Sequence, residues 1–282
     1  MRQLKDFCAP GTQIREEMMP VSDQVSLKVT TFIPKGKSDN PAVFFVPGWV
    51  SLVESWKDVL LEMTRDFKIY YVESREKISS HVNGKVEYGV EAISNDIAVL
   101  AETFDLQAHN YILFGSSLGA TAILESCRDL SVVPKCLVLV APNALFRVPK
   151  TWVGIVRCFY PPAYSLLKPS VKWYLKNFRM GVDEDPAQYS KYSQALDEAD
   201  PWKLRKGVLD LYKYEVWDIL PDIEYPALII GASKDSLHEP ENLQRMVREM
   251  KNAKYLDMET NKKSHTAEVV HEIRSYLKEL AG

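Results

Sequence analysis

Residues 111–122 read YILFGSSLGATA, and this stretch decides the fold that the sequence predicts. Strand-forming residues are followed by two adjacent serines between glycines, and small residues come next. The pattern Gly-x-Ser-x-Gly fits in one register alone, with Ser117 at its centre between Gly115 and Gly119. Such a serine occupies a sharp turn from a strand to a helix, where the residues two before and two after it must be tiny. The alternative interpretation is a structural strand-to-helix turn, and we expect no chemical role for Ser116.

Strand-like and helix-like segments alternate on both sides of this stretch, which is typical of a parallel sheet with crossover helices. Residues 25–34 alternate as an exposed strand does, whereas 41–48 is continuously apolar, as in a strand buried on both faces. The predicted strands are 25–34, 41–48, 67–74, 110–116, 135–143, 225–233 and 253–259. Helical spacing predicts helices over 89–104, 118–130, 240–251 and 266–280.

The interval 143–225 has no strand-like run and contains only helical pieces that prolines interrupt. It holds 15 of the 30 aromatic residues of the chain. Because ordinary connections are a few residues long, we predict a helical unit here, inserted between two strands of a core formed by 1–142 and 226–282. Its first part, 143–182, has seven Lys and Arg residues and no acidic residue, whereas 183–224 has 11 acidic and five basic residues.

The composition limits the classes of protein that the chain can belong to. Hydrophobic residues at 46% and charged residues at 26% are ordinary for a soluble globular protein, and a net charge of −3 argues against nucleic acid as a partner. No apolar run reaches the roughly 18 residues of a membrane span, and the charged N-terminal residues lack a secretory h-region, so we expect a cytoplasmic protein. The cysteines show no CxxC pair and no metal-like spacing with histidine, which predicts reduced thiols and no metal (Cys8, Cys127, Cys136 and Cys158).

A serine hydroxyl is a poor nucleophile near neutral pH and needs an adjacent base. With a serine on this kind of turn, the order along the chain is serine, acid, histidine, and the histidine follows the last strand. His265 stands there, after the predicted strand 253–259. Asp235, on the loop after the predicted strand 225–233, is the candidate acceptor for the other ring N–H of the histidine, and Glu239 is the alternative.

The other four histidines receive no catalytic role. His271 lies inside the predicted terminal helix, and His238 comes too early in the order. His81 and His109 are interpreted as ordinary loop residues.

Two N–H groups are needed to hold the negative oxygen of a tetrahedral intermediate. The backbone of Leu118, directly after Ser117, is the first candidate. The backbone of Trp49, which follows the predicted strand 41–48, is the second. Both are main-chain groups, so the identity of these side chains matters little for this role.

The motifs GSSLG (115–119), GASKD (231–235) and SHTAE (264–268) resemble, in this order, those of the α/β-hydrolase superfamily, in its serine esterase and lipase-like branch. The resemblance covers nearly the whole chain. It implies a sheet of about eight mostly parallel strands flanked by helices, a helical cap at 143–225 over the active site, and no metal or organic cofactor.

The chain departs from the pattern of this family in two places. Pro47 and Gly48 stand where many members have His-Gly before the oxyanion donor. The segment ESREKISS (73–80) keeps Arg75 and Ser80 of the family pattern D-x-R-G-x-G-x-S but has lost both glycines. We therefore expect this loop to have a different conformation and to shape the pocket entrance.

Acyl transfer to water is the reaction that these residues support, with a small-molecule ester or thioester as the substrate. We expect hydrolysis of carboxylic esters with an apolar acyl or aromatic group, because the insert is rich in aromatic residues. A lysophospholipase or an acyl-coenzyme A thioesterase is one alternative, and a non-catalytic ligand-binding protein on a hydrolase scaffold is another. The segment 143–182 fits transient contact with an anionic membrane or the phosphates of coenzyme A, or it packs on the core with solvated lysines.

Overall fold

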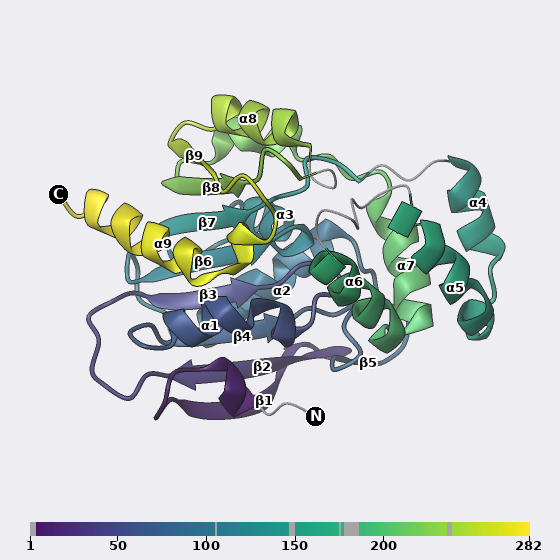
Figure 1. Cartoon of the computed structure of the whole chain (residues 1–282), viewed down its shortest axis with the longest axis horizontal. Coiled ribbons are helices and arrows are strands. Elements are labelled where there is room, and N and C mark those ends of the chain that lie inside the picture. The colour runs from purple at the N-terminus through teal and green to yellow at the C-terminus, as the bar shows by residue number, and fades with distance from the viewer. Residues whose placement is uncertain (1–3, 105, 147–149, 175, 178–185, 236–238) are drawn as a thin grey trace.

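One mixed β-sheet runs through the molecule in the order β1-β2-β4-β3-β6-β7-β8-β9, and β5 pairs with β2 (Figure 1). The computed structural model describes residues 4–104, 106–146, 150–174, 176–177, 186–235 and 239–282. Neighbouring strands from β4 to β9 are parallel, whereas β2 is antiparallel to each strand it pairs with. The strands are β1 (Gln13–Ser22), β2 (Val25–Ile33), β3 (Ala42–Val46), β4 (Ile69–Glu73), β5 (His81–Val82), β6 (Tyr111–Ser116), β7 (Cys136–Val140), β8 (Ala227–Gly231) and β9 (Ala253–Asp257).

The seven strands predicted from the sequence are all present, as β2, β3, β4 and β6 to β9. The interpretation of 25–34 as an exposed strand is wrong, because β1 pairs along β2 and five of the nine residues of β2 are buried. β1 was not predicted from the sequence. Its side chains are nearly all exposed or partly exposed, so it has no regular apolar pattern to find.

Helices cover both faces of the sheet (Figure 1). One hydrophobic core joins the sheet to α1 and α9, and the other joins it to α2, α3 and α8. β6 shows why the central strands are apolar throughout: Tyr111 and Leu113 belong to one core, Ile112 and Phe114 to the other, and all four are fully buried. These helices are α1 (Lys57–Met63), α2 (Val90–Thr103), α3 (Leu118–Ser126), α8 (Pro240–Glu249) and α9 (Ala267–Glu279).

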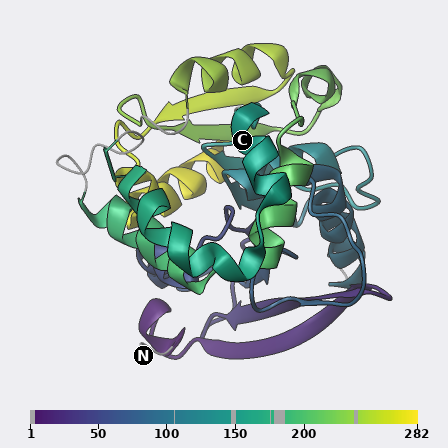
Figure 2. The same cartoon turned by 90° about the vertical axis from the view of Figure 1, so that its right-hand side faces the viewer.

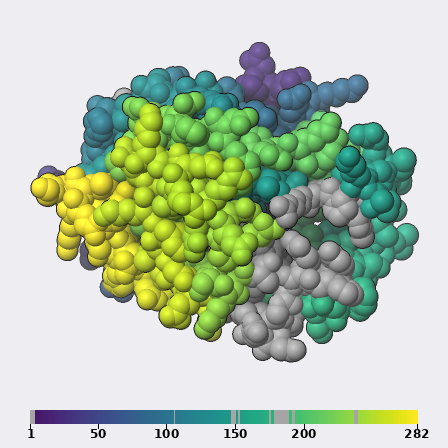
Figure 3. All heavy atoms as spheres, turned by 90° about the horizontal axis from the view of Figure 1, so that it is seen from above, coloured from purple at the N-terminus to yellow at the C-terminus, as the bar shows by residue number. Residues whose placement is uncertain are grey.

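The insert, residues 143–225, lies between β7 and β8 and is helical in its described part. Its helices are α4 (Lys150–Cys158), α5 (Tyr164–Tyr174), α6 (Pro186–Glu198) and α7 (Pro201–Leu211), with 3-10 turns η3 (Pro161–Ala163) and η5 (Trp217–Asp222). α4 to α7 gather beyond one end of the sheet strands and face the viewer in Figure 2. The space-filling view shows them, in teal and green, at one end of the molecule (Figure 3).

Three further observations concern membranes, metals and thiols. Among the described residues, no helix combines the length and apolar character needed to cross a bilayer. The same part of the chain has no cluster of three or more His, Cys, Asp or Glu side chains suited to a metal ion. All four cysteines are free thiols, and burial raises the pKa of Cys136 to about 12.

Candidate active site

Ser117 stands on a strained turn between β6 and α3. Its backbone has φ 49° and ψ −119°, which is outside the regions that non-glycine residues ordinarily occupy. Two hydrogen bonds hold the turn: Ser117 N–H donates to the Val140 carbonyl at 2.9 Å, and Thr121 N–H donates to the Ser117 carbonyl at 3.0 Å. The turn presents the side chain at the carboxyl end of β6, as the sequence motif predicts.

Glycines on both sides of the serine make this turn possible. A Cβ at Gly119 would lie 2.2 Å from the Val46 carbonyl oxygen, and a Cβ at Gly115 would lie 2.7 Å from Ala120 Cα. Both distances are far below van der Waals contact and involve backbone atoms, so a larger residue cannot fit without moving β3 or α3. A Cβ at Gly48 would lie 3.2 Å from Ser117 Cβ, which places the loop after β3 directly beside the serine.

Asn143 holds the Ser117 hydroxyl, and the sequence analysis missed it. The hydroxyl donates to Asn143 Oδ1 at 2.7 Å. Thr121 fixes the asparagine, because its Oγ1 accepts from Asn143 N–H at 2.9 Å and donates to the Asn143 carbonyl at 3.0 Å. The only available signal was position: Asn143 follows β7, whose carboxyl end adjoins that of β6.

Four predicted site residues follow parallel strands of the sheet. Trp49 follows β3, Ser117 follows β6, Asp235 follows β8 and His265 follows β9. Because these strands are parallel, their carboxyl ends meet at the same edge of the sheet. Residues up to 216 positions apart in the chain are therefore gathered at this edge, next to the insert.

The contacts of His265 determine which ring nitrogen carries the proton in the neutral ring. Nδ1 lies 2.9 Å from the Asn261 carbonyl oxygen and 3.1 Å from Ser264 Oγ. Since a carbonyl can only accept, the contact with Asn261 assigns the proton to Nδ1 and leaves Nε2 with a lone pair. Trp56 packs on the imidazole with ring centroids 4.3 Å apart, and its Nε1 donates to Ser51 Oγ at 3.2 Å.

Asp235 is 9% exposed, and Asn261 connects it to the loop of His265. Its Oδ2 accepts a hydrogen bond of 3.0 Å from Asn261 Nδ2, while the main chain of Asn261 contacts the imidazole. The direct bond from His265 to Asp235 that the sequence suggests stays a prediction. Glu239, the alternative acid, is the N-cap residue of α8, and His238 lies outside the described residues.

The two candidate oxyanion donors flank Ser117. Leu118 is the first residue of α3, where N–H groups have no partner within the helix. Trp49 lies in the loop after β3, and among the described residues no acceptor takes its main-chain N–H. Its indole Nε1 is also buried without a partner in this part of the chain, and the ring packs against Gly207 of α7.

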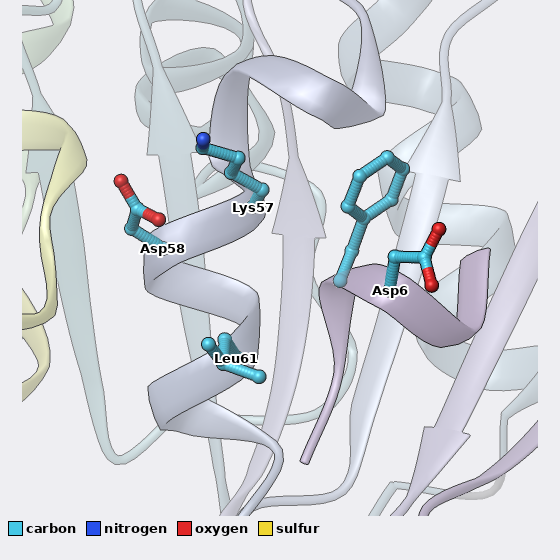
Figure 4. A pocket seen from close by; sticks show the side chains of 5 residues that line it. Asp6, Lys57, Asp58 and Leu61 are labelled. Carbon is cyan, nitrogen blue, oxygen red and sulfur yellow. The ribbon is translucent and has the colours of Figure 1, made fainter. Parts of the chain in front are cut away.

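A separate surface depression lies between α1 and the 3-10 turn η1 (Leu4–Phe7) (Figure 4). Phe7 and Leu61 provide its apolar lining, and Asp6, Lys57 and Asp58 provide charges of both signs. None of the predicted site residues lines it, so it forms no part of the candidate site.

The sheet order, the strained serine and the helices on both faces define an α/β-hydrolase fold, as the resemblance of the motifs implies. The chain is similar to N-formylmaleamate deformylase of Pseudomonas putida, with 25% identity over 223 residues that cover 74% of this chain and 76% of the relative. No protein-family model matches the chain.

Solved structures share the fold over nearly the whole chain. A thermophilic esterase from Thermogutta terrifontis has a TM-score of 0.71 at 18% identity, covering 95% of this chain and 99% of its own. A hydrolase from Pseudomonas aeruginosa PA01 has a TM-score of 0.74 at 16% identity, covering 96% of this chain and 98% of its own.

Proposed function

We propose that the chain is a serine hydrolase that cleaves carboxylic esters with an apolar acyl or aromatic group through an acyl-enzyme. The observation that supports this most is the strained backbone of Ser117, at the start of α3 and beside the loop after β3. Strain of this kind persists only where the surrounding structure enforces it, and it is concentrated at functional sites. A ligand-binding protein has no need of an activated serine.

In the proposed reaction, Ser117 Oγ attacks the substrate carbonyl and His265 Nε2 takes the hydroxyl proton. The carbonyl oxygen becomes negative and accepts from the N–H groups of Leu118 and Trp49. His265 then gives the proton to the leaving alcohol, and water attacks the acyl-enzyme by the same route. Asp235 and the Asn261 carbonyl stabilise the imidazolium, whereas Asn143 Oδ1 is an acceptor of the Ser117 hydroxyl before attack.

The insert is the proposed cap over this site, with boundaries at 143 and 225. Its helix α7 contacts the loop after β3, where Gly207 adjoins the indole of Trp49. The aromatic residues that the insert contains in large number favour an apolar group in the substrate.

A substrate panel tests the proposed function. We expect the highest kcat/KM on p-nitrophenyl esters of short to medium acyl length, and covalent labelling of Ser117 by a fluorophosphonate probe. The panel includes an N-formyl amide, because the curated relative is a deformylase. A higher kcat/KM on an acyl-coenzyme A, a lysophospholipid or the formyl amide would replace the ester proposal with that activity. Absence of labelling and turnover would favour the ligand-binding protein.

The outer face of the insert favours an additional contact, with an anionic lipid surface. Leu166 and Trp173 lie seven residues apart on α5 and are 78% and 60% exposed. Lys168 and Lys172 of the same helix turn to α6, where both pair with Asp197. α5 therefore has an apolar outer face, and described helices α4 and α5 contain basic residues and no acidic residue.

We expect the protein to co-sediment with phosphatidylglycerol vesicles more than with phosphatidylcholine vesicles, and less so at high salt. The double variant Leu166→Ser, Trp173→Ser should lose most of this binding. Leu280→Ser, at an exposed apolar residue outside the insert, is the matched control. Equal binding by the two variants would exclude the outer face of α5 as the contact.

A further inference from the structure

The loop between β4 and β5 buries a lysine beneath the loop that follows β3. Lys77 is 5% exposed, and its Nζ donates to the Gly48 carbonyl at 2.6 Å and to the Ser51 carbonyl at 3.0 Å. The carboxylate of Glu76 lies 3.6 Å from the same Nζ. Desolvation lowers the pKa of Lys77, and the neighbouring Glu76 opposes this shift. A buried cation is unfavourable unless its partners compensate it, so these contacts account for its presence here.

In segment 73–80, Ser74 to Lys77 are buried and Ile78 is exposed, and the expectation that this segment shapes the pocket entrance stays a prediction. Arg75 forms a bidentate pair with Asp96, with distances of 2.8 Å and 2.6 Å, and Ser80 Oγ donates to the Arg75 carbonyl. Glu76 occupies one of the positions where the related family pattern has glycine. The segment thus forms a charged, hydrogen-bonded support for the loop after β3.

The contact with Gly48 has a consequence for the candidate oxyanion donor. The Gly48 carbonyl and the Trp49 N–H belong to the same planar peptide unit, which is trans. In such a unit the C=O and N–H bonds point in opposite directions. The ammonium of Lys77 holds the oxygen on one side of the loop, and the N–H must therefore point to the other side. The same peptide lies beside Ser117, since a Cβ at Gly48 would be 3.2 Å from Ser117 Cβ.

We propose that Lys77 is a positioning residue, whose ammonium fixes the 48–49 peptide so that the Trp49 N–H faces the oxyanion that forms at Ser117. This inference rests on the proposed function. A hydrogen bond from a cation to the carbonyl also polarises the amide, which makes its N–H a stronger donor. Lys77 touches no substrate atom in this role and acts through the backbone of Trp49.

A second lysine connects this support to the insert. Lys203 of α7 donates from Nζ to the Lys77 carbonyl at 2.6 Å, to the Ser80 carbonyl at 2.9 Å and to Ser80 Oγ at 2.7 Å. One turn further along α7, Gly207 adjoins the Trp49 indole. α7 therefore contacts two loops. One is the loop between β4 and β5, which contains Lys77, and the other is the loop after β3, whose carbonyls accept from Lys77. These contacts connect the insert to the loop that contains the 48–49 peptide.

The variant Lys77→Met tests the proposal, because methionine keeps much of the apolar volume and removes the ammonium. We expect kcat on p-nitrophenyl butyrate to fall about 30- to 100-fold with KM within about threefold, since a misplaced oxyanion donor acts on the transition state. Affinity for a trifluoromethyl ketone, which forms a tetrahedral oxyanion on serine, should fall in proportion to kcat/KM. Lys206→Met is the control, because Lys206 lies on the same helix α7 and its ammonium pairs with Asp210 rather than with the carbonyls of either loop.

Two further measurements keep the test decisive. Hydrogen exchange of peptides covering 48–51 should be faster in Lys77→Met than in Lys206→Met, whether or not the protein hydrolyses esters. If Lys77→Met does not fold, Lys203→Met should give the same pattern at about three- to tenfold, because it loosens the loop without removing the ammonium.

Unchanged exchange at 48–51, or a folded Lys77→Met with unaltered kcat or with a loss confined to KM, would overturn the positioning role. Failure of the proposed function has a different signature, since the wild-type protein itself would then be inert towards both the ester and the ketone.

Discussion

Ser117→Ala should reduce kcat/KM on p-nitrophenyl butyrate by at least about 10⁴-fold, because the proposed acyl-enzyme cannot form without the hydroxyl. Alanine removes one oxygen atom and the hydrogen bond to Asn143, and it leaves both flanking glycines and the turn in place. The folded structure should therefore persist, which circular dichroism and a thermal unfolding curve can verify. Initial rates of p-nitrophenol release, with mass spectrometry of the fluorophosphonate adduct, measure the effect.

Ser116→Ala is the matched control, because it removes the same atom one residue earlier. Ser116 is the last residue of β6, and successive strand side chains point to opposite faces. We expect its activity to stay within about threefold of wild type, since no role in the reaction depends on its hydroxyl. Equal losses in the two serine variants would show that the register of the motif is wrong.

His265→Ala should reduce kcat by about 10⁴- to 10⁶-fold while KM changes little, because the proposed base acts on the proton and not on substrate binding. The variant also removes the ring that packs on Trp56, so a modest loss of thermal stability should accompany it. Steady-state kinetics at a pH where the wild-type rate is maximal, together with a melting curve, separates the two effects.

His271→Ala provides the comparison within the same region of the chain. His271 lies on α9, and its Nδ1 is 3.3 Å from a guanidinium nitrogen of Arg274, which pairs with Glu62 and Asp66. We expect its kcat to be nearly that of wild type. A folded His265→Ala protein that retains most of the activity would remove His265 from the reaction and require another base at this sheet edge.

Some residues of the candidate site could not be identified from the sequence because they act through backbone contacts. Asn261 holds the imidazole by its carbonyl, and Lys77 holds the loop after β3 through the carbonyls of Gly48 and Ser51. A carbonyl is present at every residue, so its use leaves no mark in the amino-acid pattern. Lys77 was visible only as one charge in a loop that had lost its expected glycines.

The sequence by itself determined seven strands of the sheet and the position of Ser117. Strands that are covered on both faces must be apolar throughout, so β3, β6, β7 and β8 could be identified as continuous apolar runs. The turn at Ser117 tolerates only glycine at positions 115 and 119. Each of these constraints restricts the residue type at its own position, and it therefore appears in the amino-acid sequence.

Only the tertiary structure decided which distant groups meet. It placed β1 outside β2 and aimed the Ser117 hydroxyl at Asn143. It also directed the buried Lys77 and the partly buried Lys203 to carbonyls of other segments. The physical reason is that such contacts depend on how the strand ends and the insert pack together in space. No spacing along the chain encodes the distance between Lys77 and Gly48, or between Lys203 and Ser80.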